Sequence, residues 1–70
     1  MSRTPRVDAR KVARVLEKHG YALVRQSGSH RMYKNADGIR VTLPIHSGRI
    51  IHPKILLKIA EDAGIPLDEF

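Results

Sequence analysis

The tripeptide Gly28-Ser29-His30 is the part of the sequence whose residue types could most directly do chemistry. An imidazole exchanges protons near neutral pH, as a general base acting on a ribose 2′-hydroxyl must. The glycine lets a phosphate approach the backbone, and Ser29 offers a hydroxyl and an N–H. Arg31 and Lys34 follow closely enough to neutralise a phosphate. Taken alone, the tripeptide is short and common, and an exposed turn histidine is then the favoured interpretation.

The other histidines suggest no metal centre. His46 and His52 could be combined with His30, but no cysteine or carboxylate joins them at a recognised spacing and HExxH is absent. We therefore expect no metal and no cofactor. His46 is interpreted as a loop histidine, with a second proton carrier or an RNA contact as alternatives. His52 is expected to serve the start of a helix, and His19 to place a favourable charge at a helix end.

The positive charge is concentrated in the first half of the chain. Residues 1–34 hold nine Lys and Arg against two acidic residues, a net charge of +7, whereas residues 35–70 hold four against five, a net charge of −1. Such an asymmetry favours a polyanionic partner, most commonly RNA or DNA. A solvated helix face is the simpler alternative. Four of the cations fall on one face of the first predicted helix: Arg10, Lys11, Arg14 and Lys18.

Length and composition predict one domain spanning residues 1–70. A chain of this size buries only about 60% of its unfolded surface, so any active site must be shallow. There is no cysteine, so disulfides and thiolate zinc sites are excluded. No apolar run approaches the length of a membrane span, and we expect a cytoplasmic protein without a membrane partner.

Hydrophobic periodicity predicts two helices and three strands. Asp8 is a good N-cap for the first helix, and Pro53 suits the first position of the second. The second helix has an apolar stripe that includes Ile55, and in the third strand Ile39, Val41 and Leu43 form one core face. Residues 1–7 are interpreted as a loose arm, residues 45–52 as a loop, and Phe70 as packing back onto the core. The predicted helices span residues 9–19 and 53–63, and the predicted strands span 21–26, 30–35 and 39–43.

The predicted order is α-β-β-β-α, an α+β fold. A three-stranded antiparallel sheet with both helices on one face is the simplest arrangement that buries every apolar stripe. This order matches the double-stranded-RNA-binding fold, whose domains read RNA mainly through shape, phosphates and 2′-hydroxyls. Fold analogy alone is weak support for a function.

The stretch from Arg25 to Ile65, RQSGSHRMYKNADGIRVTLPIHSGRIIHPKILLKIAEDAGI, resembles the HicA family of mRNA interferase toxins. The matching elements are Gly-Ser-His at the start of a strand, an Asp-Gly hairpin, a "VTLPIH" strand end, a Gly-basic loop, a helix-opening proline and a closing Ala-Gly-Ile. With the "LEKHGY" ending of the first helix, the resemblance covers roughly residues 8 to 65. No single motif is specific, but their order and spacing in so short a chain are.

The resemblance implies a double-stranded-RNA-binding-like fold that cleaves mRNA without a metal cofactor and is neutralised by a HicB-type antitoxin. The family's catalytic histidine corresponds to His30, because the Gly28-Ser29-His30 motif is intact. Two positions depart from the family pattern. Members often have a second histidine where this chain has Arg31, and an acidic residue near Ile50.

Three hypotheses follow. The leading one is a metal-independent endoribonuclease of a type II toxin–antitoxin system, with His30 as its catalytic residue. The second is a non-catalytic RNA-binding module of the same fold, and the third is an adaptor whose basic helix docks on an acidic protein. The residues expected to bind RNA are Arg10, Lys11, Arg14, Lys18, Gly28, Ser29, Arg31 and Lys34.

Overall fold

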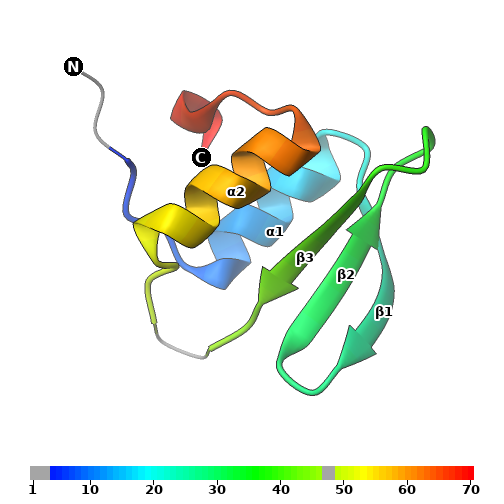
Figure 1. Cartoon of the computed structure of the whole chain (residues 1–70), viewed down its shortest axis with the longest axis horizontal. Helices are drawn as coiled ribbons and strands as arrows, with labels where there is room; N and C mark the ends of the chain where they lie inside the picture. Colours follow the sequence, from blue (N-terminus) through cyan, green and yellow to red (C-terminus); the bar gives the residue numbers. More distant parts are fainter. Residues whose placement is uncertain (1–3, 47–48) are drawn as a thin grey trace.

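A computed structural model describes residues 4–46 and 49–70 (Figure 1). The predicted order of helices and strands is confirmed. Parts of the predicted arm (1–7) and loop (45–52), namely residues 1–3 and 47–48, lie outside the described residues. The elements are α1 (Ala9–Lys18), β1 (Ala22–Ser27), β2 (His30–Lys34), β3 (Arg40–Pro44), α2 (Pro53–Ala63) and the short 3-10 helix η1 (Leu67–Glu69).

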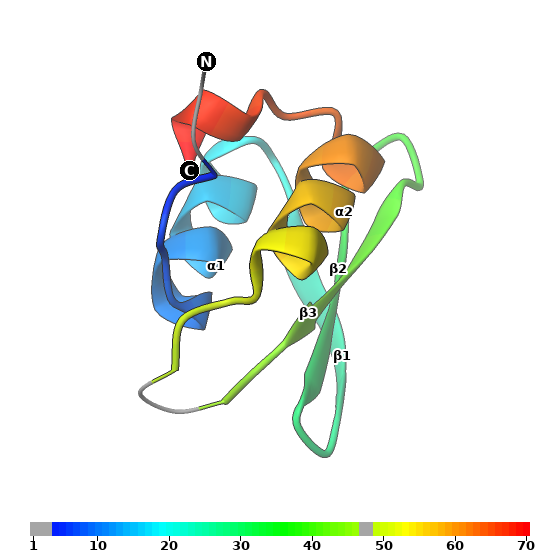
Figure 2. The same cartoon turned by 60° about the vertical axis from the view of Figure 1, so that its left-hand side comes forward.

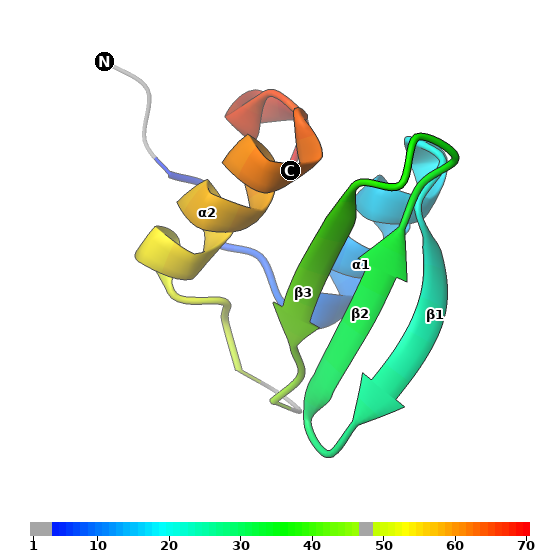
Figure 3. The same ribbon diagram turned by 45° about the vertical axis from the view of Figure 1, so that its right-hand side comes forward.

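The sheet has the strand order β1-β2-β3 and carries both helices on one face (Figure 2). Tyr33, Val41 and Leu43 project from β2 and β3 into the core, where each is almost completely buried. They meet the apolar stripes of α1 and α2, which include Leu16 and Leu56. Figure 3 shows the opposite face of the sheet, which no helix covers. The molecule therefore has one core layer and one open sheet face.

The β1–β2 hairpin closes through the two-residue loop Gly28-Ser29. Gly28 has a φ of 56°, and no non-glycine residue of the described chain has a positive φ. A positive φ at only the first loop residue is the pattern of a type II′ turn, which matches the twist of the flanking strands. The turn pairs Ser27 with His30, and the register shifts between Leu23 and Arg25, where Val24 forms a β-bulge.

The β2–β3 hairpin is the predicted one. The Asn35 Oδ1 accepts hydrogen bonds from the Asp37 and Ile39 backbone N–H groups, at 3.0 and 2.9 Å. The prediction that Ile39 belongs to the core face is wrong, since its side chain is 42% exposed. Ile39 precedes β3 and completes the hairpin loop, so it does not take part in the strand's alternation.

Polar groups define the helix starts. The Asp8 carboxylate accepts from the Lys11 N–H at 2.9 Å, and the His52 Nδ1 accepts from the Lys54 N–H at 3.1 Å, so both predicted caps are confirmed. The placement of Ile55 in the buried stripe of α2 is wrong, because it is 41% exposed. It precedes by one position the buried series Leu56, Ile59, Ala60 and Ala63, and the helical rotation of 100° per residue carries it to the rim.

The segment before α1 is not loose throughout. Val7 is buried, and its carbonyl accepts from the Ile51 N–H at 2.8 Å. Asp8 forms an isolated antiparallel bridge with Ile50. These contacts tie the start of α1 to the chain that enters α2. A short sequence cannot show such pairing, because residues 7–8 and 50–51 lie far apart along it.

The C-terminal segment returns to the core as expected. Phe70 is 8% exposed, and η1 precedes it. The His19 Nε2 lies 2.7 Å from the Glu69 Oε1, which joins the end of α1 to η1. Within residues 4–46 and 49–70, no helix has the length and apolar character needed to cross a membrane.

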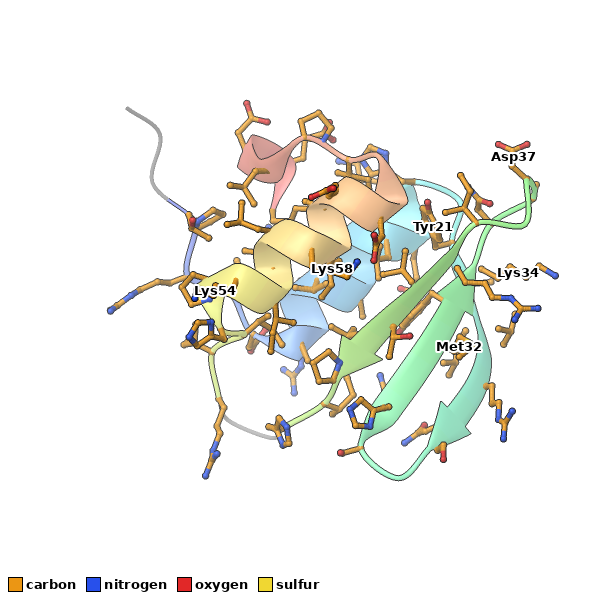
Figure 4. All side chains as sticks on the ribbon, in the orientation of Figure 1. Tyr21, Met32, Lys34, Asp37, Lys54 and Lys58 are labelled. Atoms are coloured by element: carbon orange, nitrogen blue, oxygen red, sulfur yellow. The ribbon has the colours of Figure 1, made fainter. Side chains whose placement is uncertain are left out.

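Tyr21 links the chain after α1 to the end of α2. Its buried hydroxyl donates a hydrogen bond of 2.8 Å to the Ala63 carbonyl (its position is labelled in Figure 4). Burial raises the pKa of the Tyr21 phenol, and the negative charge of Asp37 raises it further. Ionisation is therefore harder in the folded than in the unfolded chain.

We expect Tyr21→Phe to lower the free energy of unfolding by about 1 kcal/mol at neutral pH, the usual value of such a hydrogen bond. Because the folded pKa is the higher one, the wild type keeps this contribution below about pH 10 and loses it as the pH rises through the folded pKa. Urea unfolding of both proteins at pH 7 and at about pH 11 measures this. The difference in the free energy of unfolding between the wild type and Tyr21→Phe should be smaller at the higher pH. A difference that grows with pH would contradict the assignment.

Candidate active site

His30 is the first residue of β2 and lies on the open face of the sheet. Strand residues that pair directly point to the same face, and His30 pairs with Ser27 of β1 and Pro44 of β3. Tyr33, three positions along β2, is buried on the helix side, so the alternation of the strand places His30 on the other side. The histidine is exposed, and neither α1 nor α2 covers this face of the sheet (Figure 3).

The bulge at Val24 brings Arg25 to the same face. Arg25 pairs with Met32, which shares the face of His30, whereas Leu23 pairs with the buried Tyr33. Leu23 and Arg25 would share a face in a regular strand, and the extra residue separates them. Arg25 is a diagonal neighbour of His30, and diagonal residues lie about 7–8 Å apart, within reach of a long side chain.

A hollow of about 100 Å³ lies in the part of the open face that carries His30 and Arg25. The hollow is too shallow to enclose a substrate. A polymer could contact it from the surface. Met32 of β2, which is labelled in Figure 4, is one of the residues that line the hollow. The residues that line the hollow are Arg25, Ser27, His30, Arg31, Met32 and Thr42.

Arg31 and Lys34, the cations expected to act with His30, are not brought beside it. Arg31 pairs with Leu43, whose side chain is in the core, so the Arg31 side chain points to the helix side, although the residue also borders the hollow. Lys34 shares the face of His30 but lies four residues further along β2, about 13 Å away at 3.3 Å per residue. It lies near the hairpin that carries Asp37 (Figure 4).

Gly28 and Ser29 form the hairpin loop that precedes His30, and this loop fixes where His30 lies. The Ser29 carbonyl accepts a hydrogen bond from the Ile45 N–H at 2.6 Å, which extends the pairing of β2 with the end of β3. A Cβ at Gly28 would meet no atom within 4 Å, so space above the turn is open to a ligand.

The four cations predicted on α1 are all exposed, and they divide over two hollows. Arg10 and Arg14 line a groove of about 350 Å³ that also contains Arg31. Lys11 and Lys18 line a smaller one together with Arg14. Arg14 lines both hollows, so the four cations of α1 border two adjoining surfaces, which Asp8, Glu17 and Glu69 also line.

The remaining histidines lie elsewhere. His46 borders the groove beside α1 and does not line the hollow around His30. His52 caps α2, and His19 ends α1 beside Glu69. No group of three or more His, Cys, Asp or Glu side chains in the described parts of the chain is arranged to hold a metal ion.

Sequence reasoning missed Arg25, the cation nearest to His30 on its own face. Its position follows from the bulge, which a single sequence does not reveal. The one available sign is the consecutive pair Leu23-Val24, which breaks the alternation of apolar and polar residues.

These features define a small α+β protein with an accessible histidine on an open sheet face and cations on both sides of the sheet. Residues 9–65 match the family model described as HicA toxin of bacterial toxin–antitoxin, and the chain therefore belongs to the HicA toxin family. A search of curated proteins found no match.

Proposed function

We propose that this protein is an endoribonuclease that cleaves mRNA as the toxin of a toxin–antitoxin pair, with His30 as its catalytic residue. Membership of the HicA toxin family supports the class of function. The observation that carries the catalytic assignment is the exposed position of His30 on the open sheet face beside Arg25. Such a site is accessible to a polymer that could not enter an enclosed cavity.

In the proposed reaction, His30 removes the proton of a ribose 2′-hydroxyl, and the oxygen attacks the adjacent phosphorus. The bond between phosphorus and the 5′-oxygen breaks, which leaves a 2′,3′-cyclic phosphate. The departing 5′-oxygen takes up a proton from water to become a hydroxyl, and the protonated His30 returns its proton to the solvent. Negative charge builds up on the phosphorus oxygens, and a nearby cation lowers its energy. Arg25 fits this role better than Arg31 or Lys34, because it shares the face and the end of the sheet with His30.

The cations of α1 supply affinity in this proposal. Phosphate contacts position a nucleic acid without reading its sequence, and exposed Lys and Arg are suited to them. The α-β-β-β-α order is also that of double-stranded-RNA-binding domains, which makes an RNA-binding surface on this fold reasonable. The proposed RNA contacts are Arg10, Lys11, Arg14, Lys18, Gly28, Ser29, Arg31 and Lys34.

The proposed partner is a HicB-type antitoxin, and the proposed location of both is the cytoplasm. A toxin–antitoxin family implies an antitoxin partner. The net charge of +6 favours an acidic protein, because opposite charges speed encounter and select partners. A non-catalytic RNA-binding module is the alternative, and the intact Gly28-Ser29-His30 motif favours the enzyme over it.

His30→Ala should abolish RNA cleavage while the fold and most of the RNA affinity remain. Proton transfer by a positioned side chain contributes roughly 10²–10⁴-fold, and the hollow around His30 contains no second histidine. The assay is cleavage of a labelled RNA by purified protein in excess EDTA. Circular dichroism of the same protein checks that the variant is folded.

His46→Ala and His52→Ala are the matched controls and should retain cleavage. A folded His30→Ala protein that cuts RNA at the wild-type rate would remove His30 from the mechanism. Loss of wild-type cleavage in EDTA would show that a metal ion takes part.

Arg25→Gln should lower kcat by roughly 10–100-fold with little change in KM. The loss should be below the roughly 10²–10³-fold found for an enclosed oxyanion donor, because this hollow is open to water. Arg40→Gln is the control, since Arg40 pairs with Lys34 on the same face at the far end of the sheet. Equal kcat values for the two variants would place the stabilising charge elsewhere.

A HicB-type antitoxin should form a tight complex with the protein and suppress cleavage by covering His30, the α1 cations or both. Co-expression followed by size-exclusion chromatography tests complex formation, and the RNA assay tests inhibition. A stable complex that still cleaves RNA at the wild-type rate would show that the antitoxin leaves the site open.

A further inference from the structure

The groove between α1 and the start of β2 brings together residues that lie far apart in sequence. Arg10 and Arg14 enter it from α1, Arg31 from β2, and His46 from the chain after β3. The groove has a volume of about 350 Å³, and it lies on the helix side of the sheet, whereas His30 lies on the open side. Three guanidinium groups in one groove are a concentration of positive charge that the mechanism at His30 does not use.

Arg31 is the distinctive member of this set. Its side chain is partly buried, and its Nε is covered without any hydrogen-bond partner among the described residues. A covered, unpaired donor on a charged group is costly, and a partly buried guanidinium interacts more strongly with an anion than an exposed one. Arg31 lines the groove, and its guanidinium forms no ion pair with a described carboxylate.

Two carboxylates also border the groove, and neither forms an ion pair with the three arginines in the described structure. Asp8 is engaged as the N-cap of α1, where it accepts from the Lys11 N–H. Glu17 has no partner among the described side chains. The arginines therefore outnumber the carboxylates, and their donors are available to an external acceptor.

We propose that this groove is a second phosphate-binding site, which holds a backbone phosphate of the same RNA strand that is cut at His30. The planar fork of arginine matches the oxygens of a phosphate, and two or three forks around one group fix its position. His30 and Arg31 are neighbours in β2 on opposite faces. A strand bound at both sites passes around the end of the sheet formed by Gly28-Ser29 and Ile45.

This inference rests on the proposed function, but it is tested by binding alone. The probe is a short single-stranded RNA with 2′-O-methyl groups at every ribose, which has no 2′-hydroxyl to react. Fluorescence anisotropy at several salt concentrations gives the slope of log affinity against log salt. For single strands the magnitude of this slope falls by about 0.7 for each phosphate that the protein no longer neutralises.

Arg31→Gln should lower the magnitude of the slope by up to about 0.7, the value for one whole phosphate, because the other groove arginines still neutralise part of its charge. Lys54→Gln, which removes one exposed charge on α2, should change the slope by less than half as much. Arg14→Gln combined with Arg31→Gln should weaken binding by less than the product of the single effects, because both side chains hold one phosphate. Arg31→Lys keeps the charge but removes the fork, and should also bind more weakly. Glu17→Gln should bind more tightly than wild type, and by more than Glu61→Gln.

If Arg31→Gln and Lys54→Gln give the same slope while the wild-type protein cleaves RNA, the groove is not a phosphate-binding site. The proposed function would be unaffected by that result. If the wild-type protein binds the probe through Arg31 but cleaves no RNA, the groove is a phosphate-binding site and the proposed nuclease activity is wrong. If Arg31→Gln leaves RNA binding unchanged but weakens the binding of an acidic antitoxin, the groove is a protein-docking site and the proposal is wrong. Should Arg31→Gln fail to fold by circular dichroism, the exposed Arg14→Gln decides by the same slope criterion.

Discussion

The short connection between β1 and β2 constrains which face of the sheet the side chains at the start of β2 point to. A two-residue loop leaves one register, Ser27 opposite His30, and a slip of one residue would exchange the two faces of the strand. The same register places Tyr33 in the core and His30 in solvent. The apolar contribution of Tyr33 to folding therefore also holds His30 outward. The turn glycine, whose φ is 56°, makes this loop possible without strain.

The bulge at Val24 modifies that register in only one strand. Before it, Leu23 pairs with Tyr33 on the helix side, and after it Arg25 pairs with Met32 on the open side. β1 is exposed along its whole length, so burial does not dictate its alternation as it does in β3. An edge strand with little core to fill can accommodate an extra residue, and here the extra residue turns a cation toward His30.

Much of the fold can be predicted from the sequence because its signals are local. Asp8, Pro53 and the Asn35–Gly38 loop act on neighbouring backbone, and the predicted ends of the two helices and three strands lie within one residue of the observed ones. The exceptions depend on tertiary geometry. Ile39 and Ile55 continue an apolar pattern beyond the part of their element that meets the core, and Val7 is buried by pairing with a segment more than forty residues away.

The site is less predictable than the fold, because proximity in sequence differs from proximity in space. Arg31 is adjacent to His30 along the chain, yet successive strand residues face opposite ways, so adjacency separates their side chains. Arg25 is five residues away and joins His30 through pairing and a bulge. A thin domain has no interior in which to gather functional groups. It can, however, use both faces of one strand, so that neighbouring residues meet different parts of a polymer that passes around the sheet. In the proposed arrangement one face would hold the substrate and the other would react with it, although His30 and Arg31 are joined by a single peptide bond.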